Sequence, residues 1–260
     1  EEVLSNHNYS LVKKDILRCQ HVLNKKYSDV ESLEKIITLI VKLLIRNEEL
    51  NYYQGFHEII CFFVISYDTI DNLGYLIEHI AFTKLRFMMN PSLKELNDYG
   101  NIIINILKNE DQILEQHLNK IGFTPNIYLS YFLTWFVHDV MDHSFIQKIF
   151  EFYLNSDCLM PYYLFAAIVI IRRQEFMSYT CMEDFFVNKK ELMQQIDVDY
   201  LIDLSKSLYE NYARGRKPLK QLCWSDYFKQ ILFQRKFQLV SIVLTPLCLI
   251  IIKYAINLFN

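Results

Sequence analysis

Apolar residues recur at helical spacing along most of this 260-residue chain. Between residues 31 and 46 they fall three or four positions apart, which gives one apolar face and predicts an amphipathic helix. No stretch keeps for long the alternation of apolar and polar residues that marks a strand, and no internal repeat is evident. The same pattern predicts helices over 9–23, 31–46, 54–67, 73–88, 93–107, 112–120, 124–138, 144–154, 161–176, 188–195 and 199–213. We therefore predict a single all-α fold.

Composition agrees with a large helical core. Only 5 Gly and 5 Pro leave little room for tight turns and hairpins, and 52% hydrophobic content supports a core without disulfides. The six cysteines are scattered, with no C-x-x-C pair, which argues against a zinc site or a disulfide framework. A reduced, cytosolic setting fits this cysteine usage.

Charge is distributed unevenly along the chain. Residues 213–236 carry seven basic side chains and one acidic side chain, whereas residues 1–212 have a balance of −10. An acidic domain is a poor binder of nucleic acid, because contacts to phosphate dominate that affinity. We expect no nucleic-acid partner, and we interpret 213–236 as a basic linker next to a membrane.

The C-terminal stretch 237–259 holds 23 residues with one charge, Lys253. Its uncharged run is 16 residues, slightly short of the roughly 20 that span a bilayer, but Lys253 can extend its ammonium to the far headgroups. Arg235 and Lys236 flank the near side, as the positive-inside rule expects for a cytosolic domain. We predict a single-pass transmembrane anchor; the alternative is a core helix that caps the domain.

Two short clusters carry the candidate chemistry. The first is V-K-K-D-I-L-R, which ends at Arg18 and puts Asp15 on the same helix face, and the second is Y-Y-Q-G, with Gln54 36 residues after Arg18. An arginine can neutralise charge on a transferring phosphoryl group, and a glutamine can orient the attacking water. Taken singly, the first cluster is a surface ion pair and the second a helix entry.

Together these clusters resemble the first two signature motifs of the TBC family of Rab GTPase-activating proteins, I/V-x-x-D-x-x-R and Y-x-Q-G. A third region, made of residues 133–136, 145–154 and 159–161, is similar to the family's third motif. The context of Gln54 and the stretch 159–175 most resemble the endoplasmic-reticulum-anchored subfamily, the member 20 type.

The chain departs from the family pattern in places. Cys19 stands where the family usually has Thr or Ser, and K-I-F-E at 148–151 replaces the more common R-x-W-D. The family's domain normally opens with a further helical segment that has no counterpart here. We therefore expect the N-terminal part of the family domain to be missing from residues 1–212.

The resemblance implies a mechanism. Arg18 and Gln54 are the implied catalytic residues, inserted in trans into the nucleotide site of a Rab GTPase in its GTP form. Asp15, Tyr52 and Gly55 are the implied supporting residues. GTP and magnesium belong to the partner, and the chain has no cofactor of its own; in agreement, its five glycines never form a Walker A loop.

The implied setting is traffic from the endoplasmic reticulum to the Golgi. The protein would be a single-pass protein of the endoplasmic-reticulum membrane, with its domain 1–212 facing the cytosol and 237–259 in the lipid bilayer. Two alternatives remain. One is a non-catalytic helical scaffold that binds a small GTPase, and the weaker one is an integral-membrane protein with more than its last helix embedded.

Two further groups of polar residues invite other interpretations. His138, Asp139, Asp142 and His143 resemble a ligand cluster, but their spacing is not that of H-E-x-x-H, and a solvated loop explains them better. His57-Glu58, directly after the glutamine motif, is interpreted as a continuation of the helix. We expect no metal site.

Overall fold

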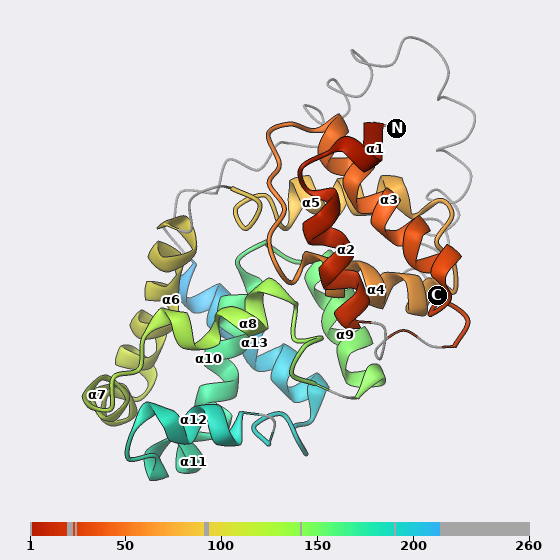
Figure 1. Cartoon of the computed structure of the whole chain (residues 1–260). Coiled ribbons are helices and arrows are strands. Elements are labelled where there is room, and N and C mark those ends of the chain that lie inside the picture. Colours follow the sequence, from red (N-terminus) through yellow and green to blue (C-terminus); the bar gives the residue numbers. More distant parts are fainter. Residues whose placement is uncertain are drawn as a thin grey trace, which may run out of the picture. The chain divides into compact units, whose positions relative to one another are not determined.

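The computed structural model describes residues 2–19, 23, 25–90, 94–140, 142–189 and 191–213 (Figure 1). These ranges contain helices and no β-strand, so the all-α prediction is confirmed. The helices are α1 Glu2–Ser5, α2 Tyr9–Arg18, α3 Val30–Arg46, α4 Phe56–Tyr67, α5 Leu73–Thr83, α6 Lys94–Glu110, α7 Gln112–Lys120, the 3₁₀-helix η2 Pro125–Tyr128, α8 Leu129–Leu133, α9 His143–Leu154, α10 Met160–Ile171, α11 Arg173–Ser178, α12 Met182–Asn188 and α13 Val198–Tyr212.

The long helix α3 follows its sequence pattern closely. Asp29 is its N-cap, and the Asp29 side chain accepts a hydrogen bond from the backbone N–H of Ser32. The apolar face is buried and packs against α2, α4 and α5. That face consists of Leu33, Ile36, Ile37, Ile40, Val41, Leu43 and Leu44. The period of 3.6 residues thus explains both the helix and its burial.

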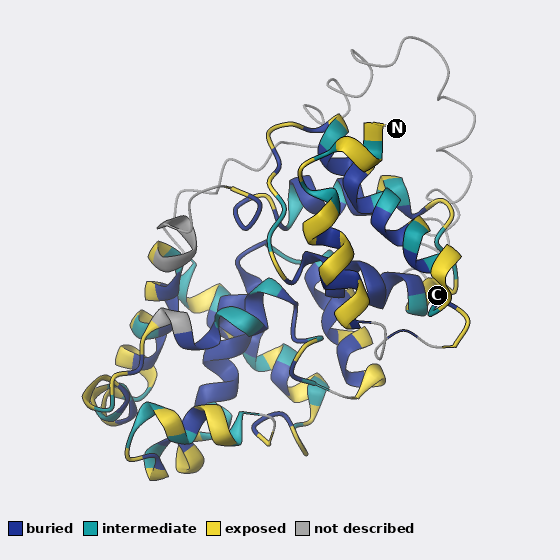
Figure 2. Cartoon of the chain, in the orientation of Figure 1, coloured by how far each residue is buried: buried dark blue, intermediate teal, exposed yellow. Residues whose placement is uncertain are grey.

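Helix α10 forms the centre of the core. Every residue from Met160 to Val169 is buried, and α10 packs against α6 and α13 (Figures 1 and 2). A helix without a polar face must be covered on all sides, which explains why the chain surrounds it with other helices. Its Phe165 contacts the rings of Phe123, Tyr128, Tyr131 and Phe132. These aromatic residues are therefore part of the core.

Several predicted helices end early or break. The helix expected over 124–138 begins as η2 and ends at Leu133, and the one expected over 73–88 ends at Thr83. The helix expected over 161–176 breaks at Arg172, whose guanidinium donates to the backbone carbonyls of Leu192 and Gln194. These contacts are made with a segment about twenty residues further on, which the local pattern does not contain.

One predicted helix is wrong. Residues 191–195 form turns rather than part of a helix over 188–195, and Gln195 has a positive φ of 59°. The helix in this part of the chain is α12, which lies earlier, and Asp184 stabilises its start by accepting from the backbone N–H groups of Thr180 and Cys181.

The described helices all belong to one compact unit. None of the helices in the described ranges is both long enough and apolar enough to cross a membrane. The predicted anchor, 237–259, and all of the predicted linker except Ala213 lie outside the described residues.

Candidate functional site

Helix α2 turns Asp15 inward and Arg18 outward. Its buried residues are Val12, Asp15 and Ile16, and its last residue, Arg18, has a side chain that is 63% exposed. The helix ends at Cys19, whose backbone N–H donates to the carbonyls of Asp15 and Ile16. The arginine therefore lies at the C-terminal end of a helix, where the helix dipole favours a cation.

Asp15 and Arg18 form an ion pair one helical turn apart. The Asp15 side chain is completely buried, and a buried carboxylate is costly unless charged or polar groups satisfy it. Because one partner is buried and the other exposed, the pair orients the guanidinium from its inner side and leaves its outer side open to solvent.

Tyr52 connects Asp15 to the segment that carries the glutamine. The Tyr52 hydroxyl donates to Asp15 Oδ2 over 2.8 Å and lies 3.0 Å from Nδ1 of His57. The backbone N–H of Gly55 donates to the same His57 Nδ1 over 3.3 Å. We call Asp15, Tyr52, His57 and the Gly55 amide the finger network, where the fingers are the two implied catalytic side chains, Arg18 and Gln54. The network contacts Arg18 through Asp15 and includes the residue next to Gln54.

Burial sets the protonation of the finger network. It raises the pKa of Tyr52, and the hydrogen bond to Asp15 raises it further, so the phenol stays protonated. Burial also lowers the pKa of His57 to about 4, and it outweighs the nearby charge of Asp15, which acts in the opposite direction. At neutral pH the finger network thus holds a neutral imidazole and a protonated phenol.

Gln54 lies exposed in the turn before α4, and Gly55 makes that turn possible. Gly55 has a φ of 115°, a backbone conformation that residues other than glycine rarely adopt. A Cβ at this position would lie 3.0 Å from the carbonyl oxygen of Leu133 and 3.1 Å from Cγ2 of Thr134. The glutamine turn therefore packs directly against the third motif region.

The backbone of that third region is unusual. Trp135 and Phe136 have positive φ values of 50° and 72°, although both are bulky and buried. The Trp135 ring packs edge-on against Phe150 and Tyr153 of α9, at centroid distances of 5.1 and 5.4 Å. These aromatic contacts compensate for the strained turn, which ends the helix and brings the Leu133 carbonyl against Gly55.

The polar residues that follow the strained turn have separate structural partners. His138 Nδ1 lies 3.2 Å from both carboxylate oxygens of Glu58, and Asp142 caps α9 by accepting from Ser144 and Phe145. Asp139 is buried and pairs with Lys189 over 2.6 Å, so its interpretation as part of a solvated loop is wrong.

Two of the sequence-predicted site residues, Arg18 and Gln54, are exposed. Arg18 is the last residue of α2, Gln54 lies in the turn before α4, and α2 packs against α4. The supporting residues Asp15, Tyr52 and Gly55 all take part in the finger network. Sequence reasoning missed His57, which does lie in α4 but bonds with Tyr52 and Gly55. The available signal was a histidine within an otherwise apolar run, because buried polar side chains need partners.

The fold and site together define an all-α domain that exposes an arginine and a glutamine on one buried polar network. Residues 1–177 match the family profile described as the Rab-GTPase-TBC domain. The match covers about two thirds of the 260 residues and includes all three motif regions. The chain belongs to this family.

Individual proteins with similar sequences are consistent with this family assignment. The chain is 28% identical over 181 residues to TBC1 domain family member 20 of Mus musculus, covering 69% of this chain and 44% of the relative. It is 29% identical over 175 residues to the GTPase-activating protein gyp10 of Schizosaccharomyces pombe, covering 62% of this chain and 46% of that protein. The chain thus spans less than half the length of these relatives.

Solved structures show the same fold. The Ypt/Rab-GAP domain of Gyp1p superposes with a TM-score of 0.63 at 9% identity, covering 82% of this chain and 76% of the other. The Chlamydomonas flagellar RabGAP TBC domain gives a TM-score of 0.60 at 9% identity, covering 78% and 68%. At this identity the likeness concerns the fold alone.

Proposed function

We propose that this chain accelerates GTP hydrolysis by a Rab-family GTPase, with Arg18 and Gln54 acting in trans. The observation that carries the proposal is the finger network, since one chain of contacts joins the Arg18 guanidinium, through Asp15, Tyr52 and His57, to the backbone of Gly55 next to Gln54. Family membership and the relatives' printed names point in the same direction.

The two side chain types suit the two tasks. Phosphoryl transfer from GTP spreads charge over phosphoryl oxygens, so positioned charges supply most of the acceleration. The guanidinium of Arg18 stays charged and donates several hydrogen bonds in a fixed plane. The amide of Gln54 can both accept from a water and donate to a phosphate oxygen. GTP and magnesium would come with the partner, in its GTP form.

The finger network would act by limiting the freedom of both fingers. Asp15 is buried and cannot move far, so Arg18 would enter the partner's site with its orientation already restricted. Gly55, adjacent to Gln54, donates its backbone N–H to His57 and leaves no room for a side chain against the Leu133 carbonyl. We therefore assign Asp15, Tyr52, His57 and Gly55 to positioning and only Arg18 and Gln54 to catalysis.

A single-turnover phosphate-release assay tests the proposal. A GTP-loaded Rab is mixed with the full chain, with Arg18→Ala, Arg18→Lys or Gln54→Ala. We expect each variant to lose most of the acceleration while still binding the Rab, since a trans arginine contributes about 10³–10⁵ in rate in known GTPases. Arg18→Lys should fail because it keeps the charge but loses the planar fork.

Lys14→Ala is the matched control, because it removes an exposed positive charge from the same helix. It should retain the activity of the wild type within a small factor. If Arg18→Ala and Gln54→Ala accelerate hydrolysis as well as wild type does, the catalytic assignment is wrong. If no Rab is accelerated by the wild type but one binds, the chain is a scaffold.

We also propose, from the sequence pattern and the subfamily resemblance, that the domain 1–212 faces the cytosol from the endoplasmic-reticulum membrane. The basic linker 213–236 and the anchor 237–259 would hold it there, in traffic between that compartment and the Golgi. Carbonate extraction of membranes that contain the full chain, or a chain lacking 237–259, tests this. Release of the full chain by carbonate would exclude the spanning anchor.

A further inference from the structure

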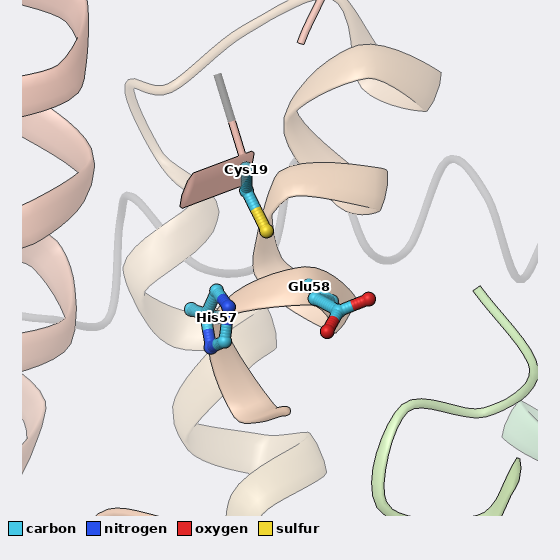
Figure 3. A group of neighbouring side chains, drawn as sticks. All are labelled: Cys19, His57 and Glu58. Atoms are coloured by element: carbon cyan, nitrogen blue, oxygen red, sulfur yellow. The ribbon is translucent and has the colours of Figure 1, made fainter. Parts of the chain in front are cut away.

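Three buried side chains of different chemistry meet between the end of α2 and the start of α4. They are Cys19, His57 and Glu58, and we call them the Cys–His–Glu cluster. A sulfur, an imidazole nitrogen and a carboxylate oxygen from this cluster all lie within 4.8 Å of one another. Figure 3 shows the Cys19 sulfur and the Glu58 carboxylate near one ring nitrogen of His57.

We propose that the Cys–His–Glu cluster binds a divalent transition metal ion of the zinc class. Thiolate, imidazole and carboxylate are the three ligand types that zinc uses in proteins. With bonds of about 2.0–2.3 Å, tetrahedral ligands lie roughly 3.3–3.8 Å apart. The three atoms lie within 4.8 Å of one another and would therefore have to approach by about 1 Å on metal binding. Three protein ligands leave a fourth position for water.

Two acidic side chains lie close to the proposed ligands. Asp15 and Glu58 are both buried, and both interact electrostatically with Cys19. Their carboxylates would stabilise a bound dication, and metal binding would release the thiol proton of Cys19 to solvent.

The outer contacts of the cluster resemble those of a metal site. The Nδ1 atom of His57 faces Tyr52 and Gly55, so the ligand from this ring would be Nε2. With a metal at Nε2 the ring proton would lie on Nδ1 and be donated to the Tyr52 oxygen, which itself donates to Asp15, and the Gly55 amide would give up its hydrogen bond to Nδ1. Glu58 is oriented by His138, whose Nδ1 lies 3.2 Å from both its oxygens.

Metal binding can be measured without any GTPase, so the test is independent of the proposed function. The full chain, stripped with a chelator, is titrated with Zn²⁺ against a coloured competitor and separately with Co²⁺. We expect one tight site and, with Co²⁺, a thiolate-to-metal charge-transfer band in the near ultraviolet. Absence of tight binding and of this band in the wild type would overturn the proposal.

Variants locate the site. Losing only an outer partner of a ligand usually weakens metal binding by about 10–100-fold. Cys19→Ser, His57→Gln and Glu58→Gln each remove a ligand, so each should weaken Zn²⁺ binding by more than that. Cys19→Ser should also abolish the cobalt band. The control is Cys181→Ser, a partly exposed cysteine outside the cluster, which should bind as the wild type does.

A Cys19→Ser variant that is folded by circular dichroism and binds Zn²⁺ with wild-type affinity would refute the assignment. Tyr52→Phe keeps all three ligands but removes the outer partner of His57. It should weaken binding by about 10–100-fold, and unchanged affinity in this variant would exclude the role given to Tyr52.

Discussion

Tyr52→Phe removes one oxygen atom from the centre of the finger network. That hydroxyl donates to the buried Asp15 carboxylate over 2.8 Å and lies 3.0 Å from Nδ1 of His57. The neighbouring residue provides a matched control. The Tyr53 hydroxyl is buried and has no hydrogen-bond partner among the described residues, so Tyr53→Phe deletes the same atom without breaking a hydrogen bond.

The expected loss of stability follows from the charge on Asp15. A hydrogen bond to a charged group contributes about 1.5–3 kcal/mol. Without the Tyr52 hydroxyl, the buried Asp15 side chain keeps its ion pair with Arg18 but loses this hydrogen bond. For a domain of this size the loss lowers the melting temperature by about 3–12 °C. Tyr53→Phe should stay within about 0.5 kcal/mol of wild type. Urea unfolding and thermal melts of the two variants measure this difference.

The same substitution should slow GTPase activation. Without the phenol, Asp15 and the turn at Gln54 lose their connection, and a misplacement of about 1 Å at a reacting group can cost about 10²-fold. We expect Tyr52→Phe to lower the single-turnover rate by about 10–100-fold with little change in the half-saturating concentration. Equal stability and equal rates for Tyr52→Phe and Tyr53→Phe would refute the finger network as a positioning device.

Three further predictions concern other parts of the fold. Gly55→Ala should destabilise the domain by about 2–4 kcal/mol in urea unfolding and reduce activation, because its φ is 115° and its Cβ would meet the Leu133 carbonyl at 3.0 Å. Gly74→Ala, whose Cβ would lie 3.6 Å from Cδ1 of Leu39, should instead be neutral or stabilise by up to about 1 kcal/mol, and the opposite order of the two glycine variants would contradict this reasoning. His79 has its pKa lowered to about 4 by burial and by Lys84, so the unfolded chain binds a proton more readily between about pH 4 and 6.5, and stability should fall as the pH falls through that window. His79→Gln should remove this contribution, at most about 1.4 kcal/mol per pH unit, and an unchanged slope of unfolding free energy against pH would exclude it.

The fold shows where local pattern is sufficient. The sequence predicts a helix over 31–46, and helix α3 spans Val30–Arg46. The agreement is close because both the apolar face and the Asp29 cap depend only on residues in or next to the helix. The helix predicted over 124–138 instead stops at Leu133, since the positive φ values of Trp135 and Phe136 depend on rings of α9 that lie some fifteen residues away. Helix existence is local, whereas where a helix ends often depends on tertiary partners.

The sequence by itself determined the helical class and the candidate residues Arg18 and Gln54. The spacing of hydrophobic residues predicts which face of a helix is buried, and the order of the motifs predicts which residues form one functional site. Neither predicts which atoms a buried polar group contacts. Only the tertiary structure joined Asp15 to Tyr52 across 37 positions, recruited His57, and brought Cys19 to within 4.8 Å of His57 and Glu58. Those contacts arise from the packing of α2 on α4, where desolvation forces each buried polar group to find a partner from another element.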